Sequence, residues 1–240
     1  EKVKKRPRFS LVSRIRFWLS LPSPKDFSRD TRMLIAATGL SAVSFFGIQM
    51  LLKSLYILRL GHGPEYLGLY YSVGALTYMS MGIPSGALGK RFGTRIIMLV
   101  GGLLCVIGMT LLPVTELVPG AAQYAWPLLS QVVLTVGWSM FNVNFVPALM
   151  TTTTGETRNQ AYALTSAVRE LGTFAGTLVG GILPELFSPW MQQGLDAPGP
   201  YRVSLFIGAG LSLGAVIPLL SAEGGRAEPK AQHSDPRGLA

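Results

Sequence analysis

The chain alternates long apolar runs with short polar segments, and six of the runs are long enough to cross a membrane as helices. A hydrocarbon core of roughly 30 Å takes about 20 helical residues. The runs lack the alternation of a barrel strand, and lipid cannot satisfy the donors and acceptors of an irregular backbone. We therefore expect an all-α membrane protein, a compact six-transmembrane-helix bundle. The expected spans are 33–58, 66–89, 95–114, 124–150, 161–187 and 203–220.

Lysine and arginine lie mainly on one side of this expected bundle. Of the 21, ten precede the first span, three lie at the turn between the second and third, one lies between the fourth and fifth, and three follow the sixth. The opposite side holds Lys53, Arg59 and Arg202. The positive-inside rule then predicts a multi-pass protein of the cell inner (plasma) membrane with both termini in the cytoplasm.

The composition agrees with a membrane protein. The chain is 49% hydrophobic and 14% charged, which is too few charges to cover a soluble globule of this size. The net charge of +9 is also typical of nucleic-acid binders, but the cations flank apolar runs without interleaved aromatics. We expect the lipid bilayer as the partner and no nucleic acid. The single cysteine, Cys105, excludes a disulfide framework, and we expect no metal site and no cofactor.

Residues 31–221 form the expected six-helix transmembrane bundle, and two polar segments flank it. Residues 1–30 form a basic cytoplasmic lead, and residues 222–240 are rich in Gly and Pro, as in a flexible cytoplasmic linker or tail. An amphipathic helix at the membrane interface and a disordered basic tail explain the lead equally well. The apolar residues at helical spacing in the lead are Leu11, Ile15, Trp18 and Leu19.

The turn between the second and third spans reads PSGALGKRFGTRIIM, from Pro84 to Met98. Its glycines permit a tight turn, and its cations suit the headgroup plane. The stretch resembles the glycine- and arginine-containing signature of the major facilitator superfamily. The resemblance implies a conformational latch between two halves of a transporter, formed by Gly86, Lys90, Arg91, Gly93 and Arg95. The family usually has an acid where Lys90 stands, so the latch is either weakened or completed by Glu156 in the other inner loop.

The fifth span contains GTFAGTLVGG, residues 172–181, which is similar to the glycine-rich motif of antiporters in this superfamily. Thr177 stands where the family has proline, which argues against antiport. Glycine at every fourth position gives a flat helix face for close packing. The glycines expected to pack are Gly172, Gly176, Gly180 and Gly181. Just before them, TGETRNQAYALTSAV is similar to the turn that leads into the family's fifth helix.

Six spans correspond to the N-terminal half of such a transporter, because the family pairs two six-helix halves about a central pathway. The resemblance implies a secondary active transporter that moves a small solute by alternating access, with drug efflux among the candidate activities. It also implies a second six-helix half, expected in the same polypeptide. The fourth span lacks the arginine of drug–proton antiporters, and the first lacks a buried acid. Proton coupling by that route is therefore not expected.

The family places its first and fourth helices along the central cavity. In the first span Thr38, Phe45, Gln49 and Lys53 share a helical stripe, although Lys53 is expected to snorkel to the outer surface. Helix-to-helix hydrogen bonds of about 1 kcal/mol explain each polar residue equally well, but two stripes in the two expected helices favour a solute pathway. The stripe of the fourth span consists of Gln131, Thr135, Trp138 and Asn142.

The fifth span carries Arg169 and Glu170 about two turns from its start. A charge at such depth costs roughly 2.5–3.5 kcal/mol on insertion scales, so it should face protein or water. Helical spacing places Arg169 near the face of Gly176 and Gly180, toward another helix or the cavity. We expect a pathway role for Arg169, and the alternative is a structural salt bridge with Glu170.

Two other functional classes fit six spans. A non-transporting membrane scaffold or channel-like oligomer is one alternative. An intramembrane serine protease is the other, since Ser85 is flanked by glycine-containing sequence. Such a protease needs a histidine on a neighbouring helix, and the two histidines, His62 and His233, lie in an outer loop and in the tail. We therefore expect no catalytic residues and no enzyme activity.

Overall fold

The structure is a computed structural model that describes residues 27–221, apart from the side chains of Glu156 and Ser221. The amphipathic helix considered for the lead and the C-terminal linker lie outside these residues. Within them the chain is helical and contains no strand. The longer elements are α2 (Arg29–Ser41), η2 (Ala42–Gln49), α3 (Met50–Arg59), α4 (Pro64–Phe92), α5 (Thr94–Leu111), α7 (Trp126–Thr152), α8 (Gly155–Met191) and α9 (Gly199–Ser221). The 3₁₀ segment η3 (Leu112–Leu117) extends α5, and a short α6 (Gly120–Gln123) precedes α7.

Five helices of the described part are long and apolar enough to cross a membrane, and they coincide with five of the six expected spans. They are Arg29–Arg59, Thr94–Leu117, Trp126–Thr152, Thr157–Met191 and Gly199–Leu220. The remaining expected span, 66–89, lies within α4. This helix has 29 residues, but tyrosine, serine and glycine make it less apolar than the others. The helical fold is thus confirmed, whereas the number of membrane spans that length and composition support is five.

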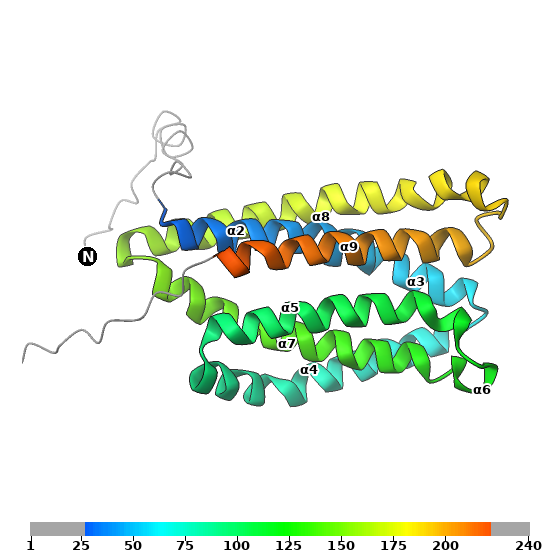
Figure 1. Cartoon of the computed structure of the whole chain (residues 1–240), viewed down its shortest axis with the longest axis horizontal. Coiled ribbons are helices and arrows are strands. Elements are labelled where there is room, and N and C mark those ends of the chain that lie inside the picture. Colours follow the sequence, from blue (N-terminus) through cyan, green and yellow to red (C-terminus); the bar gives the residue numbers. More distant parts are fainter. Residues whose placement is uncertain (1–26, 222–240) are drawn as a thin grey trace, which may run out of the picture.

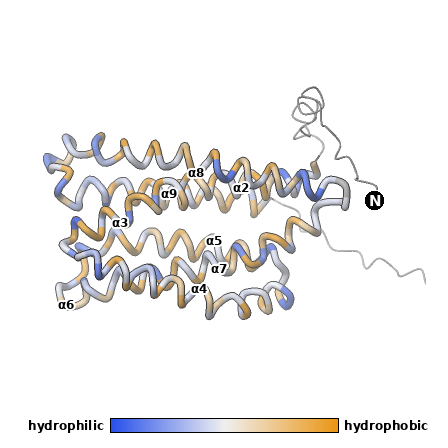
Figure 2. Tube along the Cα trace, turned by 180° about the vertical axis from the view of Figure 1, so that it is seen from behind, coloured by the Kyte–Doolittle hydropathy of each residue, from blue (hydrophilic) through white to orange (hydrophobic). Residues whose placement is uncertain are grey.

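The helices run side by side along one axis in two layers (Figure 1). One layer contains α2, α8 and α9, and the other contains α4, α5 and α7. Helix α5 also contacts α9 and thereby joins the layers. Hydrophilic residues gather toward both ends of the bundle, while the shafts are mostly apolar (Figure 2). This distribution suits a bundle whose middle lies in hydrocarbon.

Glycine allows the helices within each layer to approach closely. An ideal Cβ on Gly137 of α7 would lie 2.6 Å from the carbonyl oxygen of Gly101 on α5. A Cβ on Gly108 of α5 would lie 2.5 Å from the backbone nitrogen of Leu134. Because lipid offers no hydrophobic drive for helix association, such backbone contact supplies much of the packing energy.

The first helical rod, which consists of α2, η2 and α3, changes its helical geometry in the middle. Residues 42–49 form a π-helix between the α-helical segments α2 and α3. A π-helix uses i→i+5 hydrogen bonds, so the residues beyond it are rotated relative to an uninterrupted α-helix. Faces derived from 3.6-residue spacing therefore do not continue from Thr38 to Lys53.

The two ends of the bundle differ in their charges. At the end with the α3–α4 and α8–α9 connections, Arg59 pairs with Asp196 at 3.0 Å and Arg202 pairs with Glu116 at 3.1 Å. The opposite end holds the α4–α5 turn, with Lys90 and Arg91 exposed. Among the residues whose side chains the structure describes, neither of these two cations forms an ion pair.

Candidate substrate pathway

The polar stripe predicted on α7 faces α4 at both of its ends. The amide of Gln131 fills the space beside Gly74, where an added Cβ would overlap its nitrogen. Eleven residues further along, the Nδ2 of Asn142 donates a hydrogen bond to the hydroxyl of Tyr78 at 2.7 Å. Asn142 thus forms a helix-to-helix hydrogen bond, whereas Gln131 packs against α4 and its Oε1 has no hydrogen-bond partner.

The middle of the stripe reaches the other layer through aromatic rings. Trp138 stacks on Phe45 of η2 with ring centroids 4.9 Å apart and an interplanar angle of 16°. Phe46 meets the same indole edge to face at 5.1 Å, and Phe141 stacks on it at 6.0 Å. Thr135 is buried one turn away. Phe45 and Trp138, both expected along the pathway, thus form a contact between the layers.

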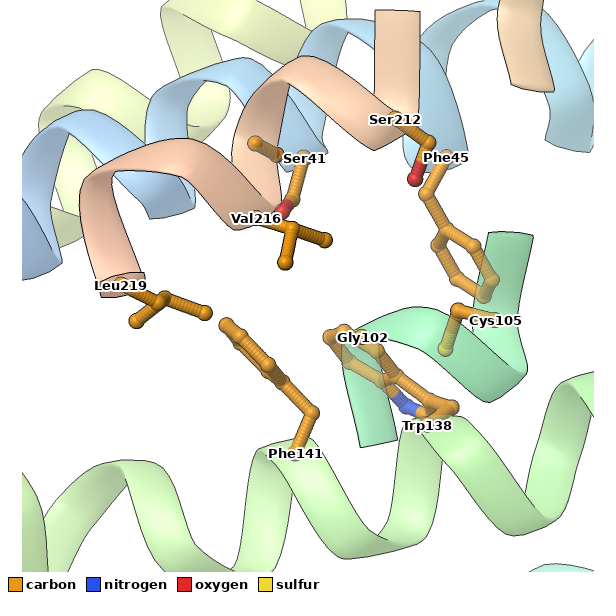
Figure 3. Close-up of a pocket in the computed structure, with 10 residues that line it drawn as sticks. Ser41, Phe45, Gly102, Cys105, Trp138, Phe141, Ser212, Val216 and Leu219 are labelled. Atoms are coloured by element: carbon orange, nitrogen blue, oxygen red, sulfur yellow. The ribbon is translucent and has the colours of Figure 1, made fainter. Parts of the chain in front are cut away.

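A small cavity of about 20 Å³ lies beside this aromatic stack, which is room for one water-sized molecule. Phe45, Trp138 and Phe141 line it together with Cys105 of α5. Ser41 and Ser212 face it from α2 and α9 (Figure 3). Ligand pockets typically measure about 300–1,000 Å³, so this space is too small to hold an organic solute.

Thr38 and Gln49, the other pathway residues expected in the first span, do not line this cavity. Thr38 is buried and its hydroxyl donates to the carbonyl oxygen of Leu34 in its own helix at 2.9 Å. Gln49 is 1% exposed, and neither atom of its amide has a hydrogen-bond partner. Its Oε1 lies 3.5 Å from where a Cβ on Gly208 of α9 would be. Gln49 and Phe45 thus face different neighbours, although both lie in the π-helical segment.

Lys53 lies in a position that the sequence reading did not anticipate. We expected its side chain to snorkel to the outer surface, but it is 4% exposed. Its ammonium lies 5.8 Å from the ring centroid of Tyr70 and 5.1 Å from that of Tyr71, both on α4. The tyrosine pair, at the same depth below the α3–α4 turn as Lys53, was the available sequence signal.

Arg169 and Glu170 form a salt bridge with each other on the surface of the described bundle. Their side chains are 47% and 68% exposed, and Arg169 Nη2 lies 3.2 Å from Glu170 Oε1. Arg169 does not join the residues around the cavity. The structure thus contains the salt bridge that was the alternative reading for this pair.

The glycines of α8 contact the first helical rod. A Cβ on Gly172 would lie 2.8 Å from the carbonyl oxygen of Gly39, and one on Gly180 would lie 3.1 Å from the Cα of Ile48. A Cβ on Gly176 would overlap the backbone of Val43. Gly181 differs, because nothing lies within 4 Å of its Cβ position and the residue is exposed. The expectation that Gly181 packs against a helix is therefore wrong within this bundle: a helix face spaced by four residues excludes it.

The residues of the glycine-rich turn between α4 and α5 have different structural roles. Gly93 has φ of +93°, a conformation that favours glycine, and it ends α4 and begins α5. Arg95 donates hydrogen bonds to the carbonyl oxygens of Leu219 and Leu220 at the end of α9, at 3.0 and 2.6 Å. Arg91 places its guanidinium 5.1 Å from the ring centroid of Phe92. The side chain of Glu156, considered as a latch partner, lies outside the described part of the structure.

One buried polar residue near this turn was missed by sequence reasoning. Asn144 is 2% exposed and donates to the carbonyl oxygens of Ser85 and Met140 at 3.0 and 2.9 Å. Its amide occupies the position that a Cβ on Gly89 would need. Gly86 is less crowded, with Val143 3.7 Å from its Cβ position. The small residues of this turn thus admit an amide from α7.

Ser85, considered as a protease nucleophile, lies beside another hydroxyl. Its Oγ is 3.2 Å from the Oγ of Ser139, and the residue is fully buried. His62 lies before the start of α4, where its ring stacks on Tyr66 with centroids 4.1 Å apart. The serine and this histidine therefore cannot exchange a proton directly.

A family model described as Major Facilitator Superfamily matches residues 31–239, which is most of the chain. No curated protein matches the chain. Together with helices long and apolar enough to cross a membrane, the match shows that this chain belongs to the major facilitator superfamily of transporters.

Proposed function

We propose that residues 31–221 form the N-terminal six-helix half of a secondary active transporter that moves a small solute by alternating access. The family of the chain supports transport. Helix α4 is taken as the sixth crossing, because its 29 residues span roughly 43 Å and it lies alongside the apolar helix α7. Its tyrosines face other helices at Tyr66 and Tyr70, which are buried.

The observation that carries the proposal is a set of buried polar groups without partners inside helices of membrane length. Gln49 lacks partners for both amide atoms, Gln131 lacks one for Oε1, and Tyr70 lacks one for its hydroxyl. Lys53 is buried at the same end of the bundle. Because unsatisfied polar and charged groups are costly in hydrocarbon, they favour a site that a solute or water reaches during transport.

A second six-helix half is part of the proposal because of the surface of α8. The membrane-length part of α8 is 22% buried, whereas the corresponding parts of the other four helices are 44–50% buried. Large apolar side chains are exposed along it, and the largest exposed fractions are those of Leu171, Phe174, Leu186 and Trp190. We infer that lipid and a second half of the transporter, expected in the same polypeptide, share this surface.

The proposed location is the cell inner (plasma) membrane with both termini in the cytoplasm. The support is the contrast between the two bundle ends: exposed cations without acids at the α4–α5 turn, and cation–acid pairs at the opposite end. Unpaired lysine and arginine next to a span are retained on the cytoplasmic side. In this orientation the α4–α5 turn, the proposed latch, faces the cytoplasm.

Counterflow in proteoliposomes tests the transport proposal. The intact polypeptide would be reconstituted and supplied with a panel of sugars, organic anions and lipophilic dyes. A transporter should exchange labelled solute outside for unlabelled solute inside, with a rate that saturates with concentration. A channel would show unsaturated flux without exchange, and a scaffold would show no flux above protein-free liposomes. Either of these results across the panel would contradict the proposal.

A further inference from the structure

Lys53 is held between helices of the same half at a defined depth. It lies six residues before the end of α3, and Tyr70 lies six residues after the start of α4, so both are roughly 9 Å below the α3–α4 turn. The hydroxyl of Tyr71 shares a hydrogen bond with Ser54 Oγ at 2.6 Å, which fixes the ring beside the ammonium. The lysine is therefore positioned rather than loosely exposed.

The positive charge of Lys53 has no acid to neutralise it among the described side chains. Of the acids near this end, Asp196 pairs with Arg59, and Glu116 accepts from Arg202 and Tyr56. Glu65 and Glu185 are exposed, and neither forms an ion pair with Lys53. The tyrosine ring faces attract a cation but leave its three N–H donors without a strong acceptor. A buried ammonium in this state is costly, and one further anionic group would relieve the cost.

A second unpaired donor lies next to the lysine. The hydroxyl of Tyr70 is buried without a well-formed hydrogen bond. Its neighbour Ser130 donates to the carbonyl oxygen of Pro127 at 2.7 Å. An ammonium and a phenol together offer donors. The complementary group accepts hydrogen bonds only and carries negative charge, and an ionised carboxylate has both properties.

We propose that Lys53, assisted by the hydroxyl of Tyr70, binds the carboxylate of an anionic solute that enters from the α3–α4 end of the bundle. The proposal rests on the transport function above and gives it a substrate class. A carboxylate could reach Lys53 from two sources, a free solute or an acidic side chain outside residues 27–221. The experiment distinguishes them.

Binding of acetate and benzoate to the intact polypeptide in detergent provides the test, with benzamide as the uncharged control and sodium chloride to match ionic strength. Calorimetry should detect at least one of the two carboxylates and no benzamide. Lys53→Met should weaken that binding by at least about 30-fold, since it removes the charge partner from a buried site. Lys53→Arg should retain part of it. Arg59→Met, which removes an exposed cation at the same end of the bundle, should leave it unchanged.

Three results would overturn the inference. Binding that survives Lys53→Met unchanged in the folded variant would place the carboxylate elsewhere. Absence of binding in the original protein, together with a melting temperature several degrees lower in Lys53→Met, would show that an acidic side chain of the polypeptide already occupies the site. Absence of binding in the original protein, with no decrease of the melting temperature in Lys53→Met, would show that no carboxylate binds at Lys53.

Failure of this inference and failure of the proposed function give different results. Counterflow of sugars or dyes without carboxylate binding would refute the carboxylate site and leave the transporter. Carboxylate binding that depends on Lys53, without counterflow of any solute, would refute transport and leave the binding site. A folded Lys53→Met variant is confirmed by an unchanged elution volume in size-exclusion chromatography.

Discussion

Arg95, at the start of α5, donates a hydrogen bond from Nε to the carbonyl oxygen of Leu219 near the end of α9 at 3.0 Å. A second bond from the same guanidinium reaches the carbonyl oxygen of Leu220. Carbonyl groups in the last turn of a helix lack intrahelical partners, and a cation there also meets the negative end of the helix dipole. The glycine-rich turn thus secures the cytoplasmic end of α9 in the proposed orientation.

Arg95→Met should loosen the last turn of α9. The loss of two charge-assisted bonds, one of them exposed to solvent, should cost about 1–2 kcal/mol of stability. Hydrogen exchange of the α9 amides near Leu219 should rise in this variant. Lys90→Met serves as the control, because Lys90 is exposed in the same turn and should leave the exchange unchanged. Equal exchange in both variants would contradict the capping role.

Gly176→Ala should separate α8 from the first helical rod. The added methyl group would overlap the backbone of Val43, which cannot move as a side chain can. Overpacking of this kind typically costs about 1–3 kcal/mol. Thermal unfolding in detergent should show a lower midpoint than in the original protein. Gly181→Ala is the matched control, since its Cβ position is open and its midpoint should not fall.

Gly89 and Asn144 should behave as a coupled pair. Gly89→Ala places a methyl group where the Asn144 amide lies, and Asn144→Ala removes two buried hydrogen bonds. Each change alone should destabilise the bundle by about 1–3 kcal/mol. In the double variant the smaller side chain of residue 144 leaves room for the methyl group. The double variant should therefore be more stable than the sum of the single effects predicts, and strict additivity would refute the contact.

Cysteine labelling should place the two ends of the bundle on opposite sides of the membrane. In a Cys105→Ala background, Lys90→Cys should react with a membrane-impermeant thiol reagent only after the cytoplasmic side is opened. His62→Cys, in the α3–α4 turn, should react in intact cells. The native Cys105 is buried and should remain unlabelled in the folded protein. Labelling of both introduced cysteines from outside would contradict the proposed topology.

The stability of the α3–α4 turn should fall in mild acid. Partial burial lowers the pKa of His62, whose ring stacks on Tyr66, below its usual value of 6.5. The unfolded turn therefore binds a proton more readily than the folded one, and stability falls as the pH drops through about 6.5. Hydrogen exchange at Tyr66 should increase between pH 7.5 and 5.5. His62→Phe keeps a ring and should remove this pH dependence.

The sequence was sufficient to locate the helices but not to orient their faces. A span must be apolar along its whole length, so the hydrophobic runs located the membrane-length helices within a few residues. Helix α4 shows the limit of this rule, because tyrosines that pack against other helices lower its hydropathy. Local composition cannot report such packing.

The candidate site could be predicted only in part for two physical reasons. Phe45 and Trp138 were expected to line one cavity, and they do stack beside a small one. Gln49 and Lys53 do not lie on the face predicted from helical spacing, because the π-helix that ends at Gln49 alters that spacing along the first span. Lys53 was also misjudged because snorkelling assumes lipid around the stem, whereas two tyrosines of α4 surround its ammonium.

The π-helix at residues 42–49 sets the direction in which Lys53 faces. Its effect depends on the number of residues that it contains more than on their chemistry, since every residue downstream turns with it about the rod axis. Shortening this segment by a single residue would swing the ammonium away from Tyr70 and Tyr71 while leaving the hydropathy of the span nearly intact. An insertion or deletion in this segment would therefore move the ammonium of Lys53 out of contact with the two tyrosine rings, without changing any residue that contacts it.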